Sequence, residues 1–67
     1  MDVIKVLEEA MRDEREDYDF YKRLAEEADD PESRAIFEAL ASEEEKHYRV
    51  LKERLTALKL RRQKTSG

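Results

Sequence analysis

The stretch Asp29-Asp30-Pro31-Glu32 divides the sequence into two long segments. The side chain of Asp30 is suited to cap a helix N-terminus, and proline favours the first helical position because its missing N–H is not needed there. Glu32 would place a negative charge near the positive end of the helix dipole. We therefore expect one helix to end before this stretch and a second helix to begin at Pro31.

The segment before this stretch has the periodicity of one long helix. Its apolar and otherwise distinctive residues recur at alternating steps of three and four, which places them along one face as a heptad seam. We predict a first helix over about residues 2–28 and a turn at 29–30. The seam residues are Ile4, Leu7, Met11, Glu14, Tyr18, Tyr21, Ala25 and Ala28.

The segment after the turn repeats this spacing. We predict a second helix over about residues 31–62 and a frayed tail at 63–67. Ile36, Val50 and Leu55 widen its seam on one side. The seam itself consists of Phe37, Leu40, Glu44, His47, Leu51 and Leu58, with Arg54 in the remaining slot.

The expected fold class is all-α, with one domain over residues 1–62. A short connection forces consecutive helices to pack antiparallel, so the two segments should form a two-helix hairpin. A chain of 67 residues has little interior of its own, and small domains usually need disulfides, a metal or a partner chain. We therefore expect two hairpins to pair and close a four-helix bundle.

Composition excludes several classes of function. The absence of cysteine removes disulfides, cysteine-based zinc sites, iron–sulfur clusters and thiol chemistry. The net charge of −4 gives nucleic acid little general attraction to the chain. No apolar run approaches the roughly 20 residues that span a bilayer, and the N-terminal residues do not form a signal peptide. These features favour a cytoplasmic protein, or one carried into an internal compartment by other means.

Three ionisable side chains interrupt the apolar seams: Glu14 in the first helix, and Glu44 and His47 in the second. Burying a carboxylate without a partner is costly, and a metal ion would compensate for it. Glu44 and His47 are three residues apart and share one side of a helix. A two-fold axis at this level would gather four carboxylates and two imidazoles, which is the ligand set of di-iron carboxylate sites.

Two segments carry a resemblance to a known family. Residues 14–26 (EREDYDFYKRLAE) look like the first metal-binding helix of rubrerythrin-like proteins in the ferritin-like superfamily. The second metal-binding helix resembles residues 30–32 (DPE) together with residues 36–47 (IFEALASEEEKH). The resemblance covers about residues 4–55. Because one hairpin is present rather than two, the chain is most similar to the half-ferritin hairpins of the encapsulated-ferritin type.

This resemblance implies a ferroxidase, which oxidises Fe(II) to Fe(III) with O2 for iron storage or detoxification. It assigns Glu14, Glu44 and His47 as metal ligands at the catalytic site, and Tyr21 as a nearby catalytic tyrosine. The implied cofactor is a di-iron centre, with manganese or zinc as alternatives because both accept carboxylate and imidazole ligands.

Further expectations come from the same resemblance. Asp13 and Glu16 match acidic positions that guide or transiently hold metal, as an uptake or secondary site. The implied partners are a second copy of the chain, a higher homo-oligomer, and an encapsulin shell, which would place the protein inside a nanocompartment in the cytoplasm. Asp17 departs from the pattern, because the wider family often has a small residue there. The chain also stops soon after the second helix, which puts shell targeting in doubt.

A second function remains open from the sequence. A glutamate three residues before a histidine is a weak signal in so acidic a chain, and His47 could be a surface histidine paired with Glu44. The alternative is a non-catalytic helical dimerisation module, whose polar seam residues fix the register with a structural metal or with none.

Overall fold

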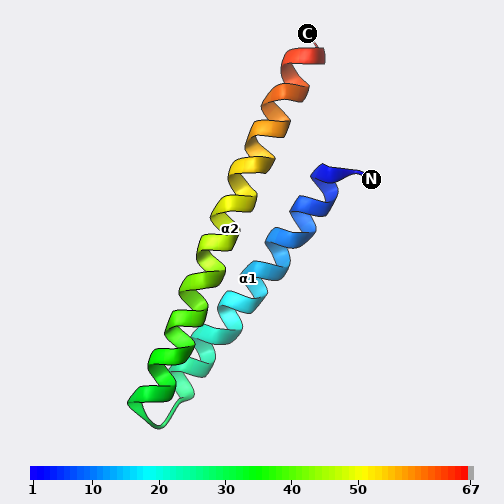
Figure 1. Ribbon diagram of the computed structural model, residues 1–67. Coiled ribbons are helices and arrows are strands. Elements are labelled where there is room, and N and C mark those ends of the chain that lie inside the picture. Colours follow the sequence, from blue (N-terminus) through cyan, green and yellow to red (C-terminus); the bar gives the residue numbers. More distant parts are fainter. Residues whose placement is uncertain (67) are drawn as a thin grey trace.

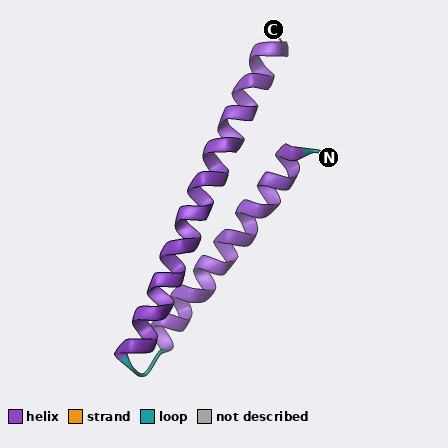
Figure 2. Cartoon of the chain, in the orientation of Figure 1, coloured by secondary structure: helices purple, strands orange, loops and turns teal. Residues whose placement is uncertain are grey.

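A computed structural model describes residues 1–66, with side chains placed for residues 1–63. Two α-helices, α1 (Val3–Glu27) and α2 (Pro31–Ser66), make up the described chain, which contains no strand (Figure 1, Figure 2). They pack antiparallel into a rod of 56 × 15 × 15 Å. The predicted helical hairpin is therefore confirmed. Neither helix, over these residues, is long and apolar enough to cross a membrane.

The turn is built as its sequence predicts. The backbone N–H of Ser33 donates a hydrogen bond of 2.8 Å to Oδ2 of Asp30, which caps the first turn of α2. This bond favours the charged carboxylate and lowers the pKa of Asp30. Ala28 leaves the helical conformation with ψ of 131°, and its carbonyl oxygen accepts a 3.4 Å hydrogen bond from the side chain of Arg34. These local contacts hold the reversal between the helices.

The second helix is longer than predicted. It continues to Ser66, past the predicted end at about residue 62, and Gly67 lies outside the described residues; fraying of the tail stays a prediction. Residues 55–66 contain neither proline nor glycine, and basic residues near a helix C-terminus are favoured by the dipole. As a result, α2 has 36 residues against 25 in α1 and projects well past the N-terminus (Figure 1).

Little of the hairpin is buried. The buried apolar residues among those described are Ala25, Ala41 and Leu55, which retain 4%, 2% and 8% of their exposure. The alanines let the helices approach closely near the turn. An interior this small leaves most of the apolar surface in contact with water.

The interior face of α2 differs from the predicted seam by one residue in part of its length. Of the predicted seam residues, Leu40, His47 and Arg54 are exposed in the single hairpin. The two sets have the same heptad spacing. The positions that are buried or half-buried instead are Ala41, Tyr48 and Leu55.

An apolar surface remains on one flank of the hairpin, which we call the open face. Large apolar side chains on it keep 38–65% of their exposure. Steps of three, four and seven residues place the α2 members on the flank that carries His47. The α1 members share the flank of Asp17, which interacts with Glu44 beside His47. The open face consists of Val6, Asp17 and Phe20 from α1, and of Ile36, Leu40, His47 and Val50 from α2.

Candidate metal centre

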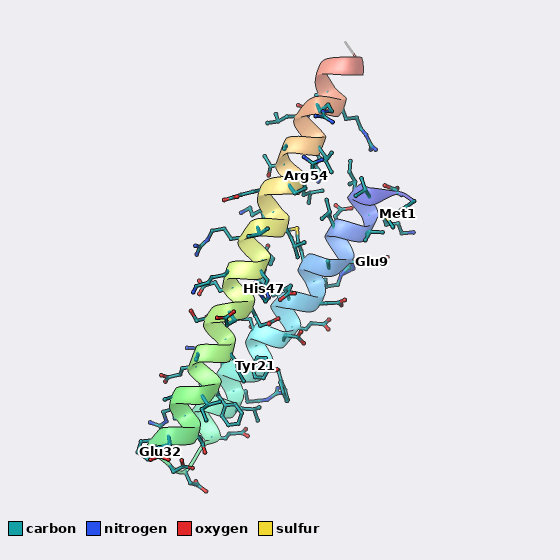
Figure 3. The ribbon with its side chains drawn as sticks, in the orientation of Figure 1. Met1, Glu9, Tyr21, Glu32, His47 and Arg54 are labelled. Atoms are coloured by element: carbon teal, nitrogen blue, oxygen red, sulfur yellow. The ribbon has the colours of Figure 1, made fainter. Side chains whose placement is uncertain are left out.

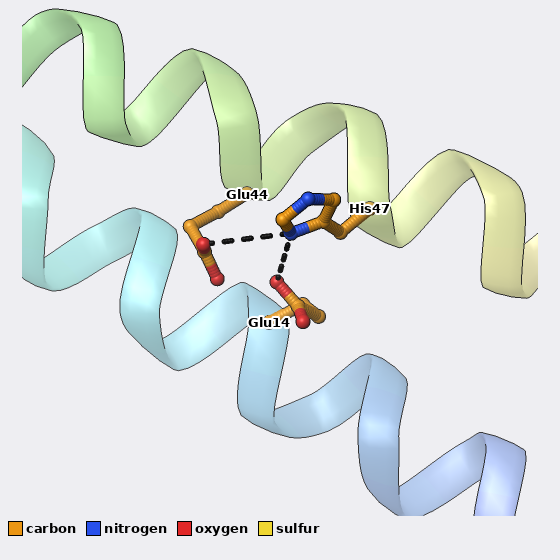
Figure 4. A group of neighbouring side chains, drawn as sticks. All are labelled: Glu14, Glu44 and His47. Atoms are coloured by element: carbon orange, nitrogen blue, oxygen red, sulfur yellow. Dashed lines mark ion pairs between the residues drawn. The ribbon is translucent and has the colours of Figure 1, made fainter.

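The three predicted ligands meet between the two helices. One ligand atom each from Glu14 of α1 and from Glu44 and His47 of α2 all lie within 4.8 Å of one another (Figure 4). Nδ1 of His47 is 3.5 Å from Oε2 of Glu14 and 3.6 Å from Oε1 of Glu44. Glu14 of α1 therefore lies level with Glu44 and His47 of α2 along the hairpin, as their spacing from the turn predicts. The three donors converge within a single chain.

The spacing of the donors is close to that of metal ligands. Two donor atoms that each lie about 2.1 Å from one ion are about 3.0–3.5 Å apart at tetrahedral or octahedral angles. The contacts of the His47 ring with Glu14 and Glu44 are at or just above the top of this range. Small rotations of the side chains would bring all three donors onto one cation.

The three side chains differ in their access to solvent. Those of Glu44 and Glu14 keep 16% and 24% of their exposure, whereas that of His47 keeps 54%. His47, a member of the open face, lies about halfway along the hairpin (Figure 3), and all three side chains point into the space between the helices (Figure 4). A cation held by the three residues would therefore have its remaining coordination positions toward that face.

The electrostatics of the carboxylate pair favour a cation. The pKa of Glu44 is raised, first by hydrogen bonding with Glu14, then by burial and by repulsion from the Glu14 charge. His47 and Asp17 offset part of this effect. Oε2 of Glu14 is buried and has no hydrogen-bond partner, which is costly for a carboxylate oxygen. A divalent ion would satisfy this oxygen and relieve the repulsion.

The donor set restricts which ion fits. Two carboxylates and one imidazole suit iron, manganese or zinc, and are less suited to calcium, which prefers oxygen ligands alone. The buried oxygen of Glu14 without a hydrogen-bond partner and the converging donors fit a cation of this kind, iron included.

The remaining predicted site residues lie near this group but outside it. Tyr21 is half-buried on α1, and its ring centroid is 5.5 Å from that of Phe20 at an angle of 59°. Over the described residues, no hydrogen bond joins its hydroxyl to the three ligands. Asp13 and Glu16 are exposed. A role for Tyr21 in catalysis, and for the two acidic residues in metal uptake, stays a prediction.

Sequence reasoning assigned no role to Tyr18 and Tyr48, which lie beside the carboxylates. They line a cavity of about 250 Å³ whose other lining residues are Glu14, Arg15, Asp19, Glu44 and Glu45. His47 does not line this cavity. The available signal was spacing, because each tyrosine follows a glutamate ligand by four residues and therefore neighbours it on the same helix.

Comparison with known proteins identifies one family. A family model described as rubrerythrin matches residues 5–66, which include both helices and all three donors. No curated protein and no solved structure matches the chain significantly. The match confirms the resemblance at the level of the ferritin-like superfamily, and the encapsulated-ferritin subtype stays a prediction.

Proposed function

The chain belongs to the rubrerythrin family of ferritin-like proteins, which usually bind iron, and from this premise we propose that it is a ferroxidase. The proposed reaction is oxidation of Fe(II) by O2 at a site formed between two copies of the hairpin. The observation that carries the proposal is the convergence of Glu14, Glu44 and His47 around a buried carboxylate oxygen of Glu14 that has no hydrogen-bond partner.

The need for a second copy follows from the number of donors. One hairpin supplies two carboxylates and one imidazole, which is half of the set that di-iron carboxylate proteins use. A two-fold axis beside His47 would double this half-set into four carboxylates and two imidazoles. The exposed position of His47 leaves it accessible to a partner.

The apolar surface supports the same arrangement. The hairpin buries few side chains, and its open face presents large apolar residues from both helices around His47. Contiguous exposed apolar surface on a small soluble domain commonly marks an interaction site. Pairing of two open faces would bury this surface and enclose the proposed metal site in one step.

Each residue has a definite task in the proposed chemistry. The carboxylates of Glu14 and Glu44 would hold iron and balance its charge, and both must be deprotonated to bind it. The neutral imidazole of His47 would donate a nitrogen. Bound iron supplies redox chemistry: two Fe(II) lose one electron each, and O2 takes up both electrons with two protons to give hydrogen peroxide. The proposed biological use is iron storage or detoxification.

The proposal is tested by adding Fe(II) to the apo protein without oxygen, admitting air, and following ferric absorbance. The wild type should oxidise Fe(II) much faster than buffer does, and Glu14→Ala and His47→Ala should fall to the buffer rate. Glu53→Ala, which removes an exposed charge from α2, the helix that carries His47, is the matched control. A wild type that oxidises no faster than buffer, or a Glu14→Ala variant with full activity, would favour a non-catalytic dimerisation module.

A further inference from the structure

The two sides of the carboxylate pair carry different residues. A helical turn has 3.6 residues, so the positions three and four after a given residue lie on opposite sides of it. His47 follows Glu44 by three residues and belongs to the open face, whereas Tyr48 follows Glu44 by four and lies on the other side. On α1, Tyr18 follows Glu14 by four residues and takes the corresponding position. The two tyrosines therefore share the flank opposite the open face.

The flank of the tyrosines is charged along most of its length. Lys59 of α2 contacts Glu8 of α1 at 3.6 Å. Heptad steps from these two residues stay on the same side of each helix, and the positions that they reach between Glu8 and Lys22 and between Glu38 and Lys59 are all charged and exposed. We call this row the charged flank, and its residues are Glu8, Arg15, Lys22, Glu38, Glu45, Lys52 and Lys59.

The cavity beside the tyrosines reaches the metal ligands from the charged flank. Its volume is about 250 Å³, and the side chains of Glu14 and Glu44 themselves form part of its wall. Liquid water takes about 30 Å³ per molecule, so a divalent ion with a shell of about six waters fits in this space. The other lining residues follow a ligand glutamate by one, four or five positions, which keeps them on the side away from His47. They are Arg15, Tyr18, Asp19, Glu45 and Tyr48.

The proposed dimer covers the other approach to the metal site. In a single hairpin the half-exposed imidazole of His47 leaves the site accessible from the open face. Pairing of two open faces buries this approach. The charged flank stays in water, because charged side chains are costly to bury without partners. An ion that arrives after the two hairpins have paired therefore needs a path on the charged flank.

We propose that divalent cations enter and leave the metal site of the dimer through the tyrosine-lined cavity on the charged flank. This inference rests on the proposed function and names the path of its metal substrate. The path differs from the one that the family resemblance implies, because neither Asp13 nor Glu16 lines the cavity.

The charge and the shape of the cavity suit a cation. Four of its lining residues are acidic and one is basic. Acidic walls raise the local concentration of cations and their rate of arrival, and salt weakens this effect. Long side chains on a helix lean toward its N-terminus, so each tyrosine lies over the glutamate one turn before it. The rings of Tyr18 and Tyr48 therefore narrow the path next to the ligands.

A removable obstruction tests the path. The chain has no cysteine, so Glu45→Cys gives a single exposed position on the cavity wall to which a bulky group can be attached through a disulfide. Binding and release of Zn(II) by the metal-free dimer are followed by stopped flow with a colorimetric zinc indicator. A residue that lines a path without holding the ion changes both rates by the same factor. We expect the attached group to slow both at least about 10-fold with little change in Kd, and reduction of the disulfide to restore them.

A second obstruction and a matched control complete the test. Asp19→Cys, which carries the same group on the α1 side of the cavity, should give the same result. Glu53→Cys is the control, because Glu53 is exposed and follows Glu44 by nine residues, which places it on the far side of α2. The group at residue 53 should leave both rates unchanged. Sedimentation checks that each modified protein is still a dimer. Unchanged rates with the group at residues 45 and 19, or equal slowing from residue 53, would overturn the proposal.

The path and the proposed function fail in different ways. If the obstruction slows Zn(II) exchange but the wild type does not oxidise Fe(II), the ferroxidase proposal fails and the path stands. If the obstruction slows oxidation of Fe(II) but not Zn(II) exchange, the cavity admits the oxidant instead and the cation path is overturned. A chain that stays monomeric would also overturn the path, because the open face would remain the way in.

Discussion

Glu14 and Glu44 are two carboxylates held closer together than their charges favour. The raised pKa of Glu44 is one result, and the buried oxygen of Glu14 without a hydrogen-bond partner is another. The pair can be relieved by a proton or by a cation, and the two compete for the same oxygens. Without metal, this cluster should therefore destabilise the fold.

Glu44→Gln should stabilise the metal-free protein at pH 7. The pKa of Glu44 is higher in the folded protein than in the unfolded chain, so Glu44 contributes stability at pH values below its unfolded-state pKa. This contribution is lost as the pH rises through the folded-state pKa. The neutral glutamine avoids this loss. The advantage of the variant should shrink as pH falls toward 4, as measured by urea unfolding with a chelator present. An advantage that grows at low pH would contradict this explanation.

His47→Ala should separate metal binding from folding. Its side chain is more than half exposed, so its removal should change the stability of the metal-free protein by less than about 1 kcal/mol. Loss of one of three donors should weaken binding of Mn(II) or Zn(II) at least 10-fold, as measured by calorimetry. Lys46→Ala, at the preceding exposed position, should leave metal affinity unchanged. A large loss of stability in His47→Ala would instead indicate a structural role.

At the scale of the helices, the sequence predicted what local chemistry determines. The cap at Asp30, the helix start at Pro31 and the level of Glu14 with Glu44 depend on short spacings and were correct. The face of α2 that packs on α1 was predicted only in part. The two candidate interior faces of α2, one with His47 and one with Tyr48, are shifted by one residue. Both have helical spacing, so only the packing against other helices determines which one is buried.

Ala41→Leu should destabilise the hairpin by about 1–3 kcal/mol, because Ala41 is buried and a larger side chain would overpack its site. Ala35→Leu is the matched control, since Ala35 is exposed on the same helix and the same change should cost little there. Urea unfolding of the two variants measures the difference. Equal stabilities would show that Ala41 is not a packing constraint.

At the scale of the whole molecule, the hairpin is a thin rod with few buried side chains, and the proposed dimer has to supply the missing interior. The sequence predicted this need from the length of the chain. It did not reveal how far α2 extends past α1, because no local breaker fixes the end of that helix before Gly67.

Thermal stability should rise with protein concentration and with added Zn(II) or Mn(II). Ligands that bind only the folded state stabilise it by about 2.7 kcal/mol at 100 times their Kd. Glu14→Ala should abolish the metal-dependent part while keeping the dependence on protein concentration. Melting curves at several concentrations, with and without metal, provide the measurement. A melting temperature independent of both would point to a monomeric hairpin without a metal site.

The arrangement of all three donors within one chain has a consequence for the order of events in the cell. A single hairpin already carries three converging metal donors. In the proposed assembly a cation can therefore bind before or after the second hairpin, and binding of either one strengthens binding of the other. The yield of paired chains would then follow the supply of metal and the square of the chain's own abundance. A low concentration of metal or of the chain itself would therefore keep the protein inactive without any separate inhibitor.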